Sequence, residues 1–105
     1  MKTLKSRKEF AEIRKKGKKI VSNIAVAYAM LGDETKIGII TSKRLGSAVK
    51  RNRIRRRIKE AINKVISNFN NVSIVLMPSN NVEQLNFVDL TAKIDSIIRM
   101  AVARG

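Results

Sequence analysis

The spacing of apolar and polar positions changes along this chain, and each change marks a different predicted element. Ser6 followed by Glu9 forms a capping-box pattern, and the apolar positions that follow predict a helix over residues 6–16 that ends at Gly17. The segment from Lys19 to Leu31 is rich in β-forming residues and alternates in its second half, which predicts a strand. An additional short strand is expected around Ile20 and Val21. The alternation places Ile24, Val26, Tyr28 and Met30 on one face and Ala25, Ala27, Ala29 and Leu31 on the other.

The middle of the chain predicts a strand, a loop and a long helix. Residues 32–36 have the composition of a turn, and residues 37–42 predict a strand that should pair with the preceding one as a hairpin. Gly46 and Ser47 belong to a loop that could cap the helix beginning near Ala48. Its apolar positions recur at helical spacing and face a core: Ala48, Ile54, Ile58, Ala61, Ile62, Val65, Ile66 and Phe69.

The last third predicts one buried strand and one helix. Residues 72–78 are continuously apolar up to Pro78, as in a strand at the middle of a sheet. After a loop, Asn86 is the predicted N-cap of a helix over residues 87–103, with Phe87, Leu90, Ile94, Ile97, Ile98 and Ala101 facing inward. We therefore expect a single domain, 1–105, of the α+β class: a two-layer α-β sandwich in which three helices cover one side of a four-stranded mixed sheet, in the order α-β-β-β-α-β-α.

The charge and composition of the chain indicate the kind of partner that it binds. A net charge of +15 and a pI near 11.1 predict a polyanionic partner, while 44% hydrophobic residues keep the chain in the globular class. The chain has no cysteine and no histidine, which removes thiolate chemistry and the commonest general base, so protein-based catalysis is not expected. No segment has the apolar length of a signal peptide or a membrane span, and we expect a cytoplasmic protein.

Nine Lys or Arg residues lie between positions 43 and 59, and no acid follows them until Glu60. A merely solvated helix usually pairs Glu with Lys four residues apart, but here Arg51/Arg55, Arg53/Arg57 and Arg55/Lys59 are like-charged neighbours. Only Arg56/Glu60 and Glu60/Lys64 are expected to compensate. A phosphate backbone that relieves this repulsion explains the pattern better than solvent does.

Other polyanions fit less well. A membrane surface would favour a Trp-containing apolar face, whereas the apolar stripe of this helix is Ile, Val and Ala and is needed for the core. Reading bases in DNA would need more Asn, Gln or Ser on the helix, so RNA of defined shape is the expected partner and DNA is not.

The segment KRLGSAVKRNRIRRRIKEAI, Lys43 to Ile62, resembles the signature of the bacterial ribonuclease P protein subunit family. LKSRKEFAEIRKKG, Leu4 to Gly17, is similar to the first helix of that family, and the later elements fall in the family's order. The resemblance implies a left-handed βαβ crossover around the basic helix, where general rules favour a right-handed one.

The resemblance also implies a function without protein-based catalysis. In the family a large RNA that uses Mg²⁺ removes the 5′ leader of precursor tRNA, and the protein is a non-catalytic subunit that binds no cofactor of its own and is not expected to be active alone. The positions that match the contacts with the catalytic RNA are Lys43, Arg44, Lys50, Arg51, Asn52, Arg53, Arg55, Arg56 and Lys59. Arg57 falls where relatives need not be basic.

The resemblance implies a second site, for the leader of precursor tRNA, between the first helix and one face of the sheet. The matching positions are Phe10, Arg14, Val26 and Tyr28. Tyr28 could stack on an unpaired base, whereas Phe10 has the helical spacing of a core residue. Arg14 replaces an aromatic residue common in relatives, so contact there would be electrostatic or cation–π. Phe69 and Phe87 are expected in the core.

Two other functions are compatible with the residues alone. A general RNA chaperone or ribosomal protein would bind many structured RNAs without preferring a leader. An independent nuclease would need a cluster of carboxylates for two-metal chemistry, and the eight acidic residues of the chain show no such grouping in sequence.

Overall fold

The computed structural model describes residues 2–4, 6–32 and 34–103; Asp33, which belongs to the predicted turn, lies outside the described residues. The elements in chain order are β1 (Lys2–Thr3), α1 (Arg7–Lys16), β2 (Lys18–Val21), β3 (Ala25–Leu31), β4 (Lys36–Ile39), the 3-10 turn η1 (Lys43–Leu45), α2 (Ala48–Val65), the 3-10 turn η2 (Ile66–Asn68), β5 (Val72–Pro78), the 3-10 turn η3 (Asn80–Gln84) and α3 (Phe87–Val102).

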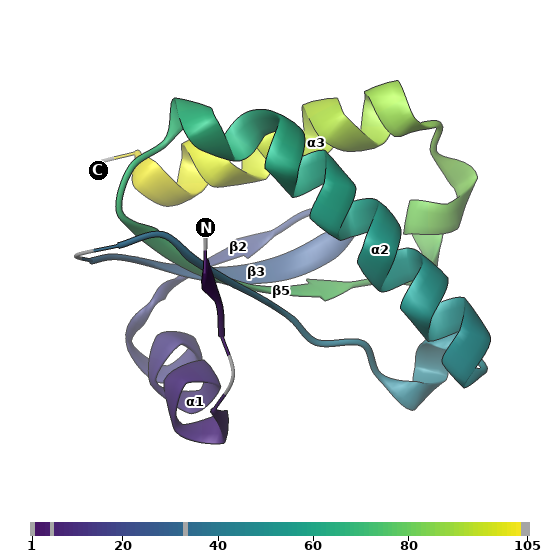
Figure 1. Cartoon of the computed structure of the whole chain (residues 1–105), viewed down its shortest axis with the longest axis horizontal. Helices are drawn as coiled ribbons and strands as arrows, with labels where there is room; N and C mark the ends of the chain where they lie inside the picture. Colours follow the sequence, from purple (N-terminus) through teal and green to yellow (C-terminus); the bar gives the residue numbers. More distant parts are fainter. Residues whose placement is uncertain (1, 5, 33, 104–105) are drawn as a thin grey trace.

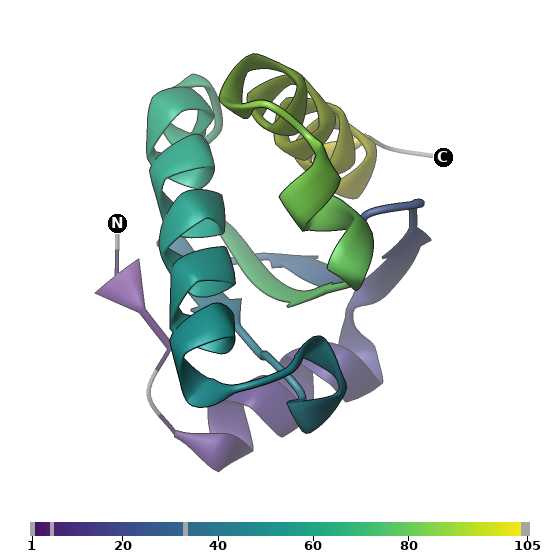
Figure 2. The same ribbon diagram turned by 90° about the vertical axis from the view of Figure 1, so that its right-hand side faces the viewer.

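The strands form one mixed sheet in the order β1-β4-β5-β3-β2. β4 is parallel to both β1 and β5, whereas β3 is antiparallel to β5 and β2. The predicted α+β class, the three helices and the four-stranded mixed sheet are confirmed, and β1 adds a two-residue edge strand that the pattern did not predict. Helices α2 and α3 cover one face, while α1 packs on the opposite face instead of joining them (Figures 1 and 2).

The predicted hairpin between the strand in residues 19–31 and the strand in residues 37–42 is wrong. β3 and β4 follow each other in the chain, but β5 lies between them and pairs with both. β5 is the most apolar strand, and five of its seven residues are buried. Placing such a strand at the centre covers both of its faces and satisfies both of its edges, which an edge position could not do.

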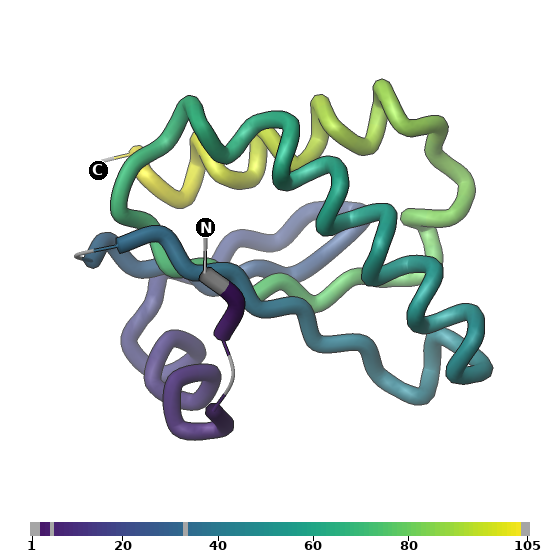
Figure 3. Tube along the Cα trace, viewed as in Figure 1, coloured from purple at the N-terminus to yellow at the C-terminus, as the bar shows by residue number. Residues whose placement is uncertain are grey.

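The crossover from β4 through α2 to β5 is left-handed, as the family resemblance implied. In Figure 1 both strands run from left to right, with β4 nearer the viewer, and the chain returns above the sheet through α2. Figure 3 traces the same path through η1, at the right, to the N-terminal end of α2. This hand is the rare one for parallel strands.

The core consists of two clusters on opposite faces of the sheet. The larger lies between the sheet and helices α2 and α3, and the smaller joins Leu4, Ile13 and Val75 under α1. In β5, Ile74 and Leu76 belong to the larger cluster. Val75, which points the other way, belongs to the smaller one. The sheet is therefore buried from both sides at its centre.

The alternation in β3 is confirmed from residue 25 to residue 30, whereas Leu31 at the end of the strand is exposed. Ala25, Ala27 and Ala29 are buried under α2 and α3, and the residues between them are half-buried on the α1 face. Ile24 does not share that second face, because it precedes the strand and packs in the larger cluster. The small alanine side chains let the helices approach the sheet closely. The residues on the other face are also apolar or aromatic, so both faces of β3 are covered.

The helix predictions hold at their caps and in most of their stripes. Ser6, Ser47 and Asn86 each accept a hydrogen bond from the backbone N–H three residues on. All predicted inward positions of α3 pack in the core. In α2, Ala48 is exposed because it occupies the first turn, beyond the end of the core. Phe69 and Phe87 are half-buried against the larger cluster, as predicted.

Candidate nucleic-acid interface

The N-terminal end of α2 is set by a glycine and a serine. Gly46 has φ = +116°, a backbone conformation that favours glycine, and it turns the chain from η1 into the helix. Ser47 then caps the helix, with its Oγ accepting from the N–H of Lys50 at 3.2 Å. Lys43 and Arg44 in η1 are thereby held next to the positive end of the helix dipole. This end of the molecule attracts anions through both side chains and backbone.

The basic residues of α2 surround its buried stripe on all its other sides. Ile54 and Ile58 are fully buried against the core, so the neighbouring positions flank them or point outward. Lys50, Arg53 and Arg57 lie on the flank that faces η3. Arg55 and Lys59 lie on the flank that faces β4. Arg56 is exposed between the two flanks.

Glu83 in η3 holds two of these cations. Its carboxylate lies 3.4 Å from Nζ of Lys50 and 3.1 Å from Nη2 of Arg53. The hydrogen bond from Arg53 lowers the pKa of Glu83, with a smaller opposing effect of desolvation and a further lowering by the charge of Lys50. Two of the predicted RNA contacts therefore share an intramolecular anion in the free protein, which the sequence did not suggest.

Arg57 has a structural role. Its guanidinium donates to the carbonyl oxygens of Val82 at 3.0 Å and Leu85 at 2.6 Å. These two bonds tie η3 and the start of α3 to α2, and the side chain is only half-exposed. Because Arg57 bonds to backbone carbonyl oxygens and not to a carboxylate, the sequence shows no acidic partner for it. In sequence it therefore looks like one more uncompensated charge of the basic helix.

Asn52 and Arg55 form a local polar group. Nη1 of Arg55 donates to Oδ1 of Asn52 at 2.8 Å, and its Nη2 donates to Oγ1 of Thr41. Both partners are neutral, so the positive charge of Arg55 is held in place but not neutralised. Arg51 is half-buried, and among the described residues its Nε is the one buried side-chain N or O without a hydrogen-bond partner.

The remaining cations are exposed and unpaired. The side chains of Lys43, Arg44, Arg56 and Lys59 make no ion pair or hydrogen bond with any described residue. The compensating pairs predicted from sequence, Arg56/Glu60 and Glu60/Lys64, are absent from the described part of the chain. Within the described part of the chain, carboxylates thus relieve the like-charge repulsion along α2 only at the flank that contacts Glu83.

The predicted leader residues lie on the opposite side of the sheet. Phe10 on α1 and Tyr28 on β3 are both half-buried at the border of the smaller cluster. Arg14, one turn after Phe10, is exposed. The structure therefore places Phe10 and Tyr28 against one shared apolar cluster, and the side chain of Arg14 has no hydrogen bond or ion pair among the described residues.

Val26 connects the two predicted sets. It lines a cavity of about 320 Å³ at the end of β3 and β5, together with Ile40, Met77 and Arg44. Arg44 belongs to η1, immediately before α2. The cavity therefore joins the sheet face that carries Tyr28 to the cationic end of α2.

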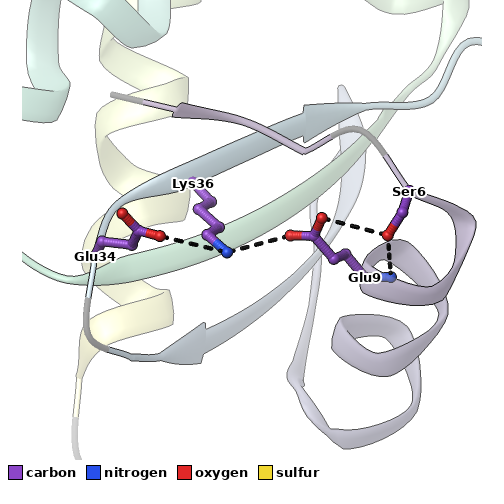
Figure 4. Close-up of polar contacts among 4 residues, drawn as sticks. All are labelled: Ser6, Glu9, Glu34 and Lys36. Atoms are coloured by element: carbon purple, nitrogen blue, oxygen red, sulfur yellow. Dashed lines mark hydrogen bonds and ion pairs between the residues drawn. The ribbon is translucent and has the colours of Figure 1, made fainter.

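An ion-pair network fixes α1 to the sheet. Nζ of Lys36 on β4 lies 3.2 Å from the Glu9 carboxylate and 3.4 Å from that of Glu34, and Oγ of Ser6 donates to Glu9 (Figure 4). The hydrogen bond to Glu9 is the main cause that raises the pKa of Lys36. The network holds the N-terminal turn of α1, which carries Phe10, against β4.

Neither a metal cluster nor a membrane span emerges from the described residues. No three Asp, Glu, His or Cys side chains lie close enough there to hold an ion. No helix in that part is both long enough and apolar enough to cross a bilayer.

Fold and surface together define a small α+β protein that presents one strongly cationic helix beside a mixed sheet. The family model of ribonuclease P matches residues 1–102. The chain belongs to the family of bacterial ribonuclease P protein components, and that family acts in tRNA processing as part of a ribonucleoprotein.

Individual relatives agree in sequence and in fold. The ribonuclease P protein component of Gluconacetobacter diazotrophicus is 34% identical over 97% of this chain and 92% of its own length. The ribonuclease P protein of Staphylococcus aureus superposes with a TM-score of 0.84 at 25% identity, covering 97% of this chain and 96% of its own. The protein from Thermotoga maritima has a TM-score of 0.83 at 22% identity and covers both chains completely, which supports the fold.

Proposed function

We propose that this chain binds the catalytic RNA of ribonuclease P through η1 and α2, and holds the 5′ leader of precursor tRNA against α1 and β3. The phosphodiester is then hydrolysed by the RNA subunit with Mg²⁺, and the protein raises substrate affinity by supplying positive charge. Membership of the family implies a partnership with ribonuclease P RNA in general terms. The residue assignments rest on the resemblance in sequence and on the geometry of the two surfaces.

One observation carries the proposal: the cations on the outer face of α2 and on η1 have no carboxylate partner. Lys43, Arg44, Arg55, Arg56 and Lys59 are all exposed and make no ion pair within the described part of the chain. An isolated helix would be destabilised by this arrangement, whereas bound phosphates would be attracted to every one of these side chains. RNA bound there would also offer acceptors to the guanidinium of Arg51, whose Nε is unsatisfied.

The number of free cations gives the expected salt dependence. Each phosphate neutralised adds about 0.7 to 0.9 to the slope of log affinity against log salt. Five unpaired cations therefore predict a slope of roughly −4, and release of Arg53 and Lys50 from Glu83 would steepen it further.

Reconstitution tests the function directly. Cleavage of a precursor tRNA by a bacterial ribonuclease P RNA is measured at low Mg²⁺, with RNA alone, protein alone and both together. We expect cleavage only when both are present. Cleavage by the protein alone would support the nuclease alternative, and RNA binding that leaves cleavage unchanged, with a closely related RNA, would support a general RNA-binding role.

Paired substitutions test the assigned surface. Arg51→Ala with Arg53→Ala should weaken holoenzyme assembly and reduce its salt slope by 1 to 2. The matched control is Lys19→Ala with Lys64→Ala, which removes the same charge from exposed positions away from the N-terminal half of α2. Equal losses for the two pairs would mean that net charge, and not this surface, drives binding.

The leader site has its own test. Tyr28→Ala should weaken binding of precursor tRNA by the holoenzyme roughly 5- to 100-fold while leaving mature tRNA unaffected, because one stacked base is worth about 1–3 kcal/mol. Met30→Ala, on the same half-buried face of β3, is the control for lost packing. If Tyr28→Ala weakens the binding of precursor tRNA and of mature tRNA equally, Tyr28 is a core residue and not a leader contact.

A further inference from the structure

A second cavity lies at the edge of the sheet, away from the cavity that Val26 lines. β1 pairs with β4 only at Lys36 and Ile37, so β4 continues past the end of its edge partner. Beyond that end, a cavity of about 220 Å³ opens between α1, β4 and α2. Its walls come from three parts of the chain that are distant in sequence: residues 3, 4 and 10, residues 37 and 39, and residues 55 and 59.

The cavity has an apolar floor and a cationic rim. The floor is formed by Leu4, Phe10, Ile37 and Ile39. Arg55 and Lys59, one helical turn apart on α2, stand at the rim. Neither cation is within ion-pair distance of a described carboxylate, and the side-chain hydrogen bonds that Arg55 makes with described residues go to neutral groups.

We propose that this cavity receives one unstacked nucleotide of the bound RNA, with its base on the apolar floor and its flanking phosphates on Arg55 and Lys59. The inference rests on the proposed RNA-binding function and adds a base-binding pocket between the cations of α2, to which only phosphate contacts are otherwise assigned, and Phe10 of the proposed leader site. Single-stranded nucleotides are held in this way, by an aromatic or apolar platform combined with cations that follow the backbone.

Charge complementarity selects this occupant. A neutral apolar ligand would leave two adjacent cations unpaired at the rim, and a free phosphate would leave the apolar floor exposed to water. A nucleotide satisfies both parts, since its base has an apolar face and its backbone carries negative charge. Thr3, on the end of β1, lines the same cavity and adds a hydroxyl that could bond a base edge.

Two five-nucleotide single-stranded RNAs test the proposal with the full chain. One carries a central adenosine and the other a central abasic nucleotide, so both have the same phosphates. We expect the adenosine probe to bind roughly 5- to 100-fold more tightly. In amide NMR spectra it should shift Leu4, Ile37 and Ile39. Equal affinity of the two probes, or amide shifts confined to Tyr28 and its neighbours on β3, would overturn the proposal.

A filling substitution gives an independent check. Thr3 is exposed on a short edge strand, so Thr3→Trp should close the cavity without disturbing the core, and Thr3→Ser is the control that keeps it open. Thr3→Trp should abolish the preference for adenosine and weaken assembly with ribonuclease P RNA. Decanoate, an anionic chain without a base, is the competing probe. If the amide signals of β4 shift with decanoate but not with the adenosine RNA, the cavity would be assigned to an acyl chain instead.

The two proposals fail in different ways. If the wild-type chain does not assemble with ribonuclease P RNA, the proposed function is wrong. If it assembles normally and Thr3→Trp changes neither assembly nor the preference between the two probes, only the pocket is wrong. The probe comparison uses the unaltered chain, so it decides the matter even if Thr3→Trp does not fold.

Discussion

Gly38 and Phe10 should be energetically coupled, because the aromatic ring lies against the glycine backbone. A Cβ placed on Gly38 would overlap Cε1 of Phe10 and lie 2.6 Å from its Cζ, far inside van der Waals contact. It would also lie 2.9 Å from Cδ1 of Leu4, the flexible end of a side chain that can move. Gly38→Ala must therefore displace the Phe10 ring from the smaller core cluster.

The expected magnitudes follow from this geometry. Overpacking costs about 1–3 kcal/mol, and the reduced entropy of the unfolded chain returns about 0.4–1 kcal/mol, so Gly38→Ala should destabilise the protein by about 1–2 kcal/mol. Phe10→Ala should cost about 2–3 kcal/mol, below the range for a fully buried Phe, since the ring is half-buried. With the ring absent, adding Gly38→Ala should be neutral or slightly stabilising.

A double-mutant cycle by urea denaturation measures the coupling, which should be about 1–2 kcal/mol in favour of the double variant over the sum of the single variants. Gly32→Ala is the matched control, because a Cβ there meets only the Ser73 hydroxyl at 3.9 Å and should not couple to Phe10. Additive losses for Gly38 and Phe10 would refute the placement of the ring. They would instead favour a solvent-facing position for the Phe10 ring.

Three further outcomes are expected. Arg57→Lys should cost about 1–2 kcal/mol in urea denaturation, because it loses a forked contact with two carbonyls, whereas Arg56→Lys should stay within about 0.5 kcal/mol. Glu83→Gln should tighten RNA binding at neutral pH by freeing two cations. Because the folded-state pKa of Glu83 is lowered, the wild-type carboxylate stabilises the fold above its unfolded pKa and loses this effect in acid. The stability deficit of Glu83→Gln relative to wild type should therefore shrink as pH falls below 4.5, and a constant deficit would contradict this. Lys36 has a raised pKa, so the deficit of Lys36→Met should be complete at neutral pH and shrink above pH 10.5 in thermal melts.

Local chemistry made most of the elements predictable. The caps at Ser6, Ser47 and Asn86 depend on side chains three residues from the amides they bond, so their signal lies within a few positions of sequence. Strand pairing is different. The contact of β5 with both β3 and β4 depends on the relative burial of distant segments, and a turn between two strands favours a hairpin unless a more apolar strand displaces it. The two-residue strand β1 is too short to produce any pattern.

The candidate site divides in the same way. Clustered charge in α2 was visible in sequence, and exposure of Arg56 and Lys59 agrees with it. The partner of Lys50 and Arg53 was not visible, because Glu83 is thirty residues from Arg53 along the chain. Sequence therefore identified which residues are basic, and only the structure separates those held by the protein from those available to RNA.

The central position of β5 also determines the order in which the molecule can be completed. β3, β4 and α2 all leave the ribosome before residues 72–78, so none of them can join a finished sheet until the centre has been synthesised. During that interval the edges of β3 and β4 that later pair with β5 are open, and the apolar stripe of α2 has nothing to cover. Folding of this chain is accordingly non-local and late, with the basic helix made before the sheet that supports it.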